Sequence, residues 1–90
     1  MLKRAKLMVD YQCWCIWDMD EPRNVNPDTL AISQHLQTKL HKWESEFDAT
    51  LDLTNHTKIG FKSKDEQSDF YDRGWLLFEE LKAALPEVEW

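Results

Sequence analysis

Two stretches of the chain repeat their apolar residues with the spacing of an α-helix. The first helix is predicted over residues 33–49, where Ser33 is a favourable N-cap. The second begins at Ser63, which opens a Ser-x-x-Glu capping box, and ends before Pro86. The predicted inner faces comprise Leu36, Leu40, Trp43 and Phe47 in the first helix, and Phe70, Gly74, Leu77, Phe78, Leu81, Ala84 and Leu85 in the second.

Gly74 is an unusual residue on the predicted inner face of the second helix. Glycine costs about 1 kcal/mol of helix propensity relative to alanine. We therefore expect it at a place where the helix packs closely on a sheet or on the first helix.

The remaining apolar segments are short and predict strands. Residues 5–12 form the first strand, with an extension to residue 16 as the alternative. Residues 49–53 alternate weakly, and residues 87–90 form a last strand. Turn-forming residues fill 18–32, which we expect to be a loop with a single helical turn starting at Asn26.

These elements predict an α/β fold of the α+β kind. We expect a single domain over residues 1–90, a small two-layer domain in which two long helices pack on one face of a short two- to three-stranded sheet. If the first and last strands are neighbours, they should run parallel, because one or both helices connect them.

Aromatic and acidic residues are concentrated where the first strand ends. Trp14 and Trp17 are followed by Asp18, Asp20 and Glu21. Side chains alternate in a regular strand, so the two tryptophans should face opposite ways and at least one should join the core. Which face of the strand is covered stays open. We expect the three carboxylates at the surface, as candidates for contact with a partner.

The second helix carries another aromatic and acidic group. Tyr71 and Trp75 lie four residues apart, and Trp75 is about 100° around the helix from Gly74. They predict either core packing at the helix edge or an interface anchor, since Trp and Tyr are enriched at binding hot spots. Residues 66–90 carry a local charge of −5. The acidic candidates for partner contact are Asp69, Asp72, Glu79 and Glu80.

No pattern of residues indicates catalysis. Cys13 and Cys15 are one residue apart, too close for the usual zinc-binding pair, and we expect two reduced thiols without a disulfide. Asp18 and Asp20 lack the spacing of a calcium loop. The sequence therefore predicts no metal, no cofactor and no catalytic residue.

Charge and hydropathy narrow the kinds of partner. The formal net charge of −6 opposes binding to a phosphate backbone and is compatible with a basic protein partner or with solubility alone. No apolar run approaches the roughly 20 residues that cross a bilayer. We expect a cytoplasmic protein that binds neither nucleic acid nor membrane.

Several segments together resemble a known family. They are residues 6–18 (KLMVDYQCWCIWD), the apolar stripe of the first helix, Phe61-x-Ser63, and Phe70 with Gly74. The combination is similar to small acidic immunity proteins of bacterial polymorphic and contact-dependent toxin systems. The resemblance implies a cytosolic inhibitor of one cognate toxin domain, often a nuclease. It carries over no binding residue, because such interfaces differ between pairs.

Our leading hypothesis is thus an immunity protein, a monomer or weak homodimer, that blocks a basic toxin domain by shape and charge. The alternative is a small regulatory or homo-oligomerising domain, and a metal- or thiol-dependent enzyme is a more remote third. The sequence does not name the toxin.

Overall fold

The computed structural model describes residues 2–50 and 60–90, and both predicted helices are confirmed in it. Helix α1 spans Gln34–Asp48, and the Ser33 hydroxyl accepts the Leu36 N–H at 3.1 Å. Helix α2 spans Lys64–Ala84, and the Ser63 hydroxyl accepts the Glu66 N–H at 3.1 Å. These caps satisfy donors that have no partner inside a helix.

The predicted first strand is wrong in its extent. Strand β1 covers only Ala5–Leu7, and the chain then reverses into β2, Ile16–Asp18. The reversal is closed by Cys13, whose N–H donates to the Asp10 carbonyl at 3.3 Å, and Gln12 takes a positive φ of 60°. The Gln12 N–H in turn donates to the Asp48 carboxylate at the end of α1, at 2.8 Å.

A third strand lies inside the segment that was predicted to be a loop. Strand β3, Arg23–Val25, pairs antiparallel with β2, which itself pairs antiparallel with β1, so the sheet order is β1-β2-β3. The predicted helical turn is confirmed as the 3-10 helix η1, Pro27–Thr29, and the Asn26 side chain caps it.

The C-terminal segment makes less sheet than predicted. Glu89 forms a single parallel bridge with Arg4, as the expected parallel pairing requires, but no regular strand follows. The Ala5 N–H donates to the Glu89 carbonyl, and the Glu89 N–H donates to the Lys3 carbonyl, both at 2.8 Å. The weak strand predicted at 49–53 lies mostly outside the described residues.

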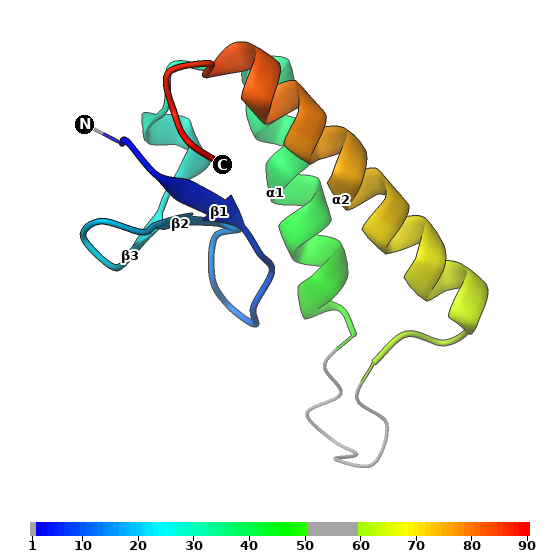
Figure 1. Ribbon diagram of the computed structural model, residues 1–90. Helices are drawn as coiled ribbons and strands as arrows, with labels where there is room; N and C mark the ends of the chain where they lie inside the picture. Colours follow the sequence, from blue (N-terminus) through cyan, green and yellow to red (C-terminus); the bar gives the residue numbers. More distant parts are fainter. Residues whose placement is uncertain (1, 51–59) are drawn as a thin grey trace.

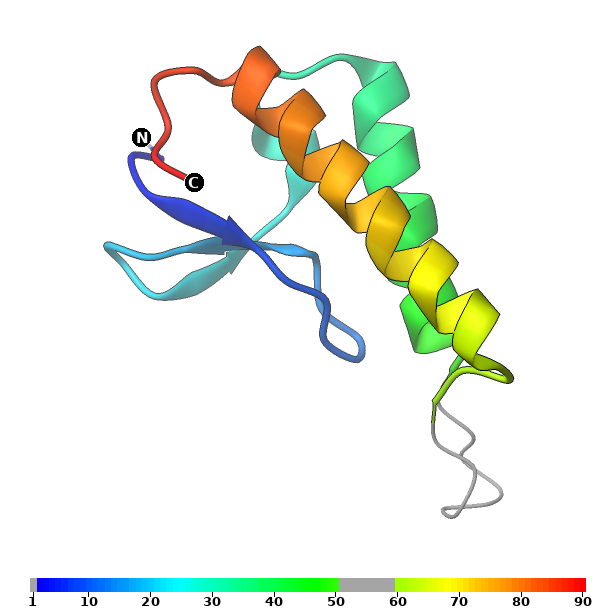
Figure 2. The same ribbon diagram turned by 45° about the vertical axis from the view of Figure 1, so that its right-hand side comes forward.

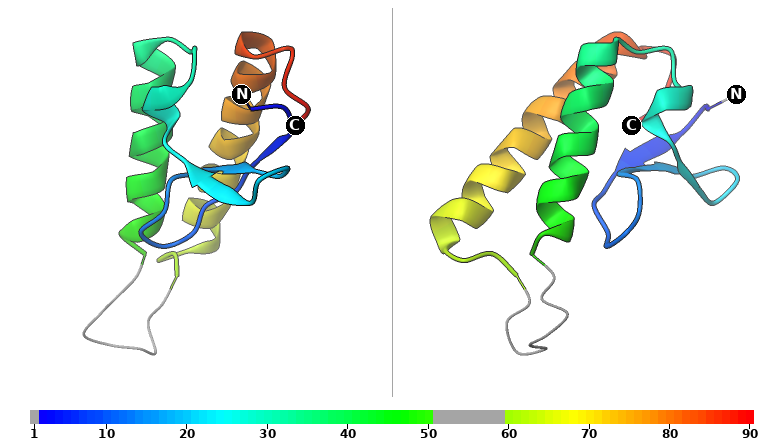
Figure 3. Two further views of the ribbon diagram at one scale, coloured as in Figure 1. Left: turned by 90° about the vertical axis from the view of Figure 1, so that its left-hand side faces the viewer. Right: turned by 180° about the vertical axis from the view of Figure 1, so that it is seen from behind.

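The elements form the two layers that the sequence predicts. The two helices run side by side, and the small sheet lies against one side of the pair (Figures 1 and 2). Figure 3 shows the same arrangement from the side and from behind, with the C-terminal segment beside β1. The core between the layers consists of Ala5, Cys15, Ile16, Val25, Leu36, Leu40, Trp43, Phe70, Leu77, Leu81, Leu85 and Val88.

Gly74 packs closely on the first helix, as its position predicts. A Cβ atom there would lie 2.5 Å from Cζ2 of Trp43. Trp43 is held in place by a hydrogen bond from its indole N–H to the Phe70 carbonyl, at 2.9 Å, and it stacks on the Phe70 ring. The absence of a side chain at 74 lets the Trp43 ring lie directly beneath α2.

Candidate partner-binding groove

An apolar groove separates β1 from α2. Its volume is about 420 Å³. One wall is the chain from Lys6 to Val9, the other is α2, and Trp43 lies at the bottom beside Gly74. We call this hollow the β1–α2 groove; it is lined by Lys6, Leu7, Met8, Val9, Trp43, Phe47, Tyr71, Gly74, Trp75, Phe78 and Trp90.

Helix geometry explains why aromatic residues reach the groove. The buried face of α2 contains Gly74 and Leu77, so Trp75 is turned by about 100° from that face. Tyr71 and Phe78 lie one turn on either side of Trp75, and the Trp75 and Phe78 rings meet edge to face at 5.8 Å. Trp75 remains 67% exposed and Tyr71 44% exposed. Of the two readings of this pair, core packing is therefore wrong for Trp75.

Two exposed apolar residues, one in this groove and one beside it, were not predicted from the sequence. Met8 is 40% exposed on the β1 wall, and Leu76, just outside the groove on α2, is 65% exposed. Leu76 follows Trp75 and also lies off the apolar stripe of α2, which is the signal that could have identified it. Met8 carried no such signal, because the chain reversal that exposes it was not predicted.

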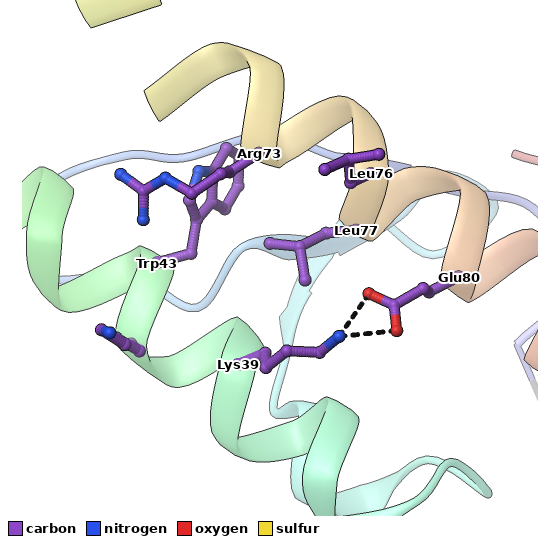
Figure 4. A pocket seen from close by; sticks show the side chains of 7 residues that line it. Lys39, Trp43, Arg73, Leu76, Leu77 and Glu80 are labelled. Carbon is purple, nitrogen blue, oxygen red and sulfur yellow. Dashed lines mark hydrogen bonds and ion pairs between the residues drawn. The ribbon is translucent and has the colours of Figure 1, made fainter. Parts of the chain in front are cut away.

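A second hollow lies on the other side of α2, against α1. It has a volume of about 240 Å³, and Leu76, Leu77 and Trp43 form its apolar part (Figure 4). Lys39 crosses it to bind both carboxylate oxygens of Glu80, at 2.6 and 2.7 Å. Glu80, which we predicted as a partner contact, is thus already engaged with α1.

The other acidic candidates on α2 differ in how strongly they are held. Asp69 pairs with Arg73 at 3.0 Å, and Arg73 also binds Glu46 of α1. Glu79 has a longer contact of 3.6 Å with Lys82. Asp72 is exposed, and no ion pair with it is found among residues 2–50 and 60–90. Asp72 and Glu79 lie three and four residues from Trp75, so they flank it on the helix surface.

The acidic group after β2 is a separate site. The β2–β3 turn and α2 lie on opposite sides of the molecule (Figures 1 and 2), so the two acidic groups do not adjoin. Asp20 pairs with Arg4 at 2.9 Å, and Glu21 is exposed.

Asp18 is buried, which corrects the expectation that it lies at the surface. It is only 5% exposed, and its carboxylate accepts the N–H groups of Asp20 and Glu21 at 2.9 and 3.2 Å. Those hydrogen bonds, that of Glu21 first, hold the pKa of Asp18 below its ordinary value, with a smaller contribution from Arg23. The side chain of Asp18 therefore shapes the turn from within.

Neither tryptophan of the first segment joins the buried core, contrary to the expectation for at least one of them. Trp14 is 41% exposed and borders a polar hollow of about 370 Å³ against α1. The backbone of Trp14 is clamped by the Asn24 side chain at 2.8 and 2.7 Å. Trp17 is half-buried, and its indole N–H donates to the Met8 carbonyl at 2.9 Å.

Hydrogen bonds link the buried carboxylate of Glu44 on α1 to Cys15 and, through His41, to the exposed Asp28. Glu44 is only 8% exposed and accepts the Cys15 N–H at 2.8 Å. Its second oxygen bonds to His41, whose other ring nitrogen bonds to Asp28, both at 2.9 Å. Burial, followed by the charge of Glu44, raises the pKa of the Cys15 thiol far above its usual range. The thiol is thus kept protonated and unreactive.

In the described part of the chain, no three His, Cys, Asp or Glu side chains converge to hold a metal ion. Both cysteines are free thiols. None of the helices described has the length and apolar character needed to cross a membrane.

These features define a small α+β domain with an apolar groove between its edge strand and its outer helix. The family model described as Serratia CdiI immunity protein-like matches residues 3–89, and the chain belongs to this family. The resemblance to immunity proteins of contact-dependent toxin systems is thereby confirmed. No curated protein matches the chain.

Proposed function

We propose that this chain binds and neutralises one cognate toxin domain through the β1–α2 groove, in the cytoplasm and without catalysing a reaction itself. The observation that carries the proposal is Trp75. Its side chain is 67% exposed at the edge of an apolar groove, in a chain of the CdiI immunity family.

The position of Trp75 matches that of an interface anchor. A large aromatic ring held in water offers much apolar area for a partner to bury. Tyr71, at 44% exposed, and Met8, at 40%, extend that area across the groove. Binding hot spots of this kind concentrate affinity in a few central aromatic residues.

Charge supports a basic partner of the nuclease type. Asp72 and Glu79 flank Trp75, and the chain has a net charge of −6. A nuclease needs a basic surface to hold the phosphate backbone of its nucleic acid substrate. Complementary charges would speed encounter with such a surface, and the docked chain would cover it.

The usual size of an interface indicates that one toxin domain does not cover both predicted acidic surfaces, the α2 side and the β2–β3 turn. A standard interface takes about 800 Å² from each partner, whereas the chain exposes 6276 Å² in total. One toxin domain would therefore cover the α2 side or the β2–β3 turn, which lies opposite (Figure 1). We propose the α2 side, because Trp75 is more exposed than Trp14 or Trp17.

Titration calorimetry with the purified toxin domain encoded beside this chain tests the proposal. We expect one-to-one binding in the nanomolar range and loss of toxin activity at equimolar chain. Absence of binding would overturn it. Sedimentation of the chain alone tests the alternative of a homo-oligomer, which requires a mass that rises with concentration.

A further inference from the structure

The outer edge of β1 is only half covered. The Met8 N–H donates to the Cys15 carbonyl, and the Arg4 carbonyl accepts from Met19, so the even-numbered residues of the strand face β2. Alternation in an antiparallel ladder turns the backbone groups of Ala5 and Leu7 to the outer edge. Glu89 takes the N–H of Ala5 there, at 2.8 Å.

Leu7 is the next residue on this edge. Among residues 2–50 and 60–90, no group outside the sheet hydrogen-bonds to its N–H or its carbonyl. Leu7 also lines the β1–α2 groove, together with Met8 and Val9. The groove therefore has an apolar helix wall on one side and unpaired backbone groups on the other.

A second unpaired donor lies beside the same edge. Trp90 follows Glu89 and lines the groove, and its indole N–H is buried without an acceptor in the described part of the chain. A buried N–H group without a partner costs free energy that a nearby carbonyl would recover. The groove thus lacks hydrogen-bond partners of the kind that a peptide backbone supplies.

We infer that the β1–α2 groove accepts an extended, positively charged segment of the toxin domain as an added strand on β1; this rests on the proposed function. Its backbone would pair with Leu7, and alternate side chains would enter the groove against Trp75 and Phe78. The acidic residues Asp72 and Glu79, beside Trp75, favour a segment that carries Lys or Arg.

An extended segment fits this groove better than a helix does. A helix satisfies its own backbone groups, so docking one would bury the Leu7 N–H and carbonyl without partners. An added strand continues a pairing that Glu89 has already begun on the same edge. Uncovered strand edges are otherwise blunted or covered in proteins, because they pair readily with other chains.

Replacing one backbone amide by an ester tests the pairing directly. Ligation at Cys13 allows a synthetic segment 1–12 that carries an ester in place of the Leu7 N–H, with every side chain unchanged. The comparison is an ester at Met8, which removes an N–H bonded to the Cys15 carbonyl within the sheet and also weakens the Leu7 carbonyl as an acceptor on the outer edge. The probe is the purified toxin domain encoded beside this chain, titrated into ester and all-amide chains.

We expect the Leu7 ester to weaken toxin binding about ten-fold. It should lower the unfolding transition less than the Met8 ester does, because inside the sheet it only weakens the Lys6 carbonyl opposite Trp17, whereas the Met8 ester removes a hydrogen bond. In the unmodified chain, hydrogen exchange at the Leu7 N–H should slow at least ten-fold when toxin binds, because a new hydrogen bond protects it. If an ester chain fails to fold, this exchange measurement decides alone.

The remaining outcomes are distinct. Tight binding with unchanged Leu7 exchange and a neutral ester would overturn the added strand but not the immunity function. Leu7 protection that grows with the concentration of the chain alone would assign the edge to a second copy and overturn the toxin as its occupant. No binding by the all-amide chain would overturn the proposed function and this inference with it.

Discussion

The ring of Trp43 occupies the space where a side chain at Gly74 would begin. An ideal Cβ at position 74 would lie 2.5 Å from Cζ2 of Trp43 and 3.2 Å from Cε2 and Cη2. The contact is with a large ring that also stacks on Phe70 and donates a hydrogen bond to its carbonyl. The ring cannot move aside without breaking both interactions, so this contact sets how closely α2 approaches α1.

We expect Gly74→Ala to destabilise the protein, although alanine is the better helix former. The gain in propensity is about 1 kcal/mol, while forcing a methyl group into a packed site costs typically 1–3 kcal/mol. Because stacking on Phe70 and the hydrogen bond to its carbonyl both hold the Trp43 ring, we expect a net loss of up to about 2 kcal/mol in the free energy of unfolding, measured in urea. Ser68→Ala, exposed on the same helix, should be neutral or slightly stabilising.

His41 should make stability depend on pH. Burial opposes the charged imidazole, but the hydrogen bonds that its ring donates to the Asp28 and Glu44 carboxylates, together with their charges, outweigh burial and raise the pKa of His41 above its ordinary 6.5. The folded state then binds the proton more tightly than the unfolded chain. This contribution to stability is fully present below pH 6.5 and is lost as the pH rises through the folded pKa.

Unfolding in urea at several pH values, for the natural chain and for His41→Gln, isolates this effect. We expect the natural chain to lose stability through this range and the variant to lose less. His35→Gln is the control, since His35 is exposed on the same helix. Equal pH profiles for the natural chain and His41→Gln would show that the hydrogen bonds of His41 to Asp28 and Glu44 do not stabilise the fold.

Asp18→Asn should lower stability without weakening toxin binding. The substitution removes the charge that accepts the Asp20 and Glu21 N–H groups and pairs with Arg23. Because its folded pKa is lowered, the stabilisation by Asp18 is present above its ordinary pKa of 3.8 and is lost as the pH falls through the folded pKa. Thermal unfolding and titration calorimetry at neutral pH measure the two effects.

Glu21→Gln is the control for Asp18→Asn. It removes one negative charge from a nearby exposed side chain and should alter neither the stability nor the affinity for the toxin. A large loss of affinity in either variant would place the toxin on the β2–β3 turn instead of the groove.

The helices could be predicted from the sequence because the residues that define them are close together in the chain. Ser33 and Ser63 cap them, and the spacing of the apolar residues defines their buried faces. Even the close contact at Gly74 could be predicted, since a glycine in mid-helix needs a packing reason. These features depend on residues within a few turns of one another.

The sheet could not be read in the same way. The segment from Leu7 to Ile16 is largely apolar, and its reversal at Gln12 uses no Gly, Asn or Pro. It depends instead on Asp48, which lies 36 residues away. The burial of Glu44 likewise depends on the Cys15 backbone from another element. Contacts between residues far apart in the chain produce no repeating apolar pattern, so the exposed edge of β1 could not be predicted from the sequence.

Reversing the charge of Asp72 should slow association with the toxin. Asp72→Lys places a positive charge beside Trp75, and we expect the association rate to fall roughly three-fold at low salt, with less effect on dissociation. High salt should shrink the difference by screening. Surface plasmon resonance at two ionic strengths checks this.

Glu21→Lys changes the net charge by the same amount in the β2–β3 turn, and this turn lies opposite α2 (Figure 1), so the variant separates the effect of position from that of total charge. If both reversals slow association equally, the field of the whole chain steers the toxin and the α2 face has no special part in it.

The affinity of Trp75→Ala for the cognate toxin domain, compared with that of Trp14→Ala, tests the groove most directly. Both changes remove a partly exposed indole, 67% exposed at position 75 and 41% exposed at position 14, from different hollows of the surface. We expect Trp75→Ala to raise Kd at least about 30-fold, the cost of losing a hot-spot anchor, and Trp14→Ala to change it less than about three-fold. An unchanged Kd for Trp75→Ala, or a larger loss for Trp14→Ala, would contradict binding through the β1–α2 groove.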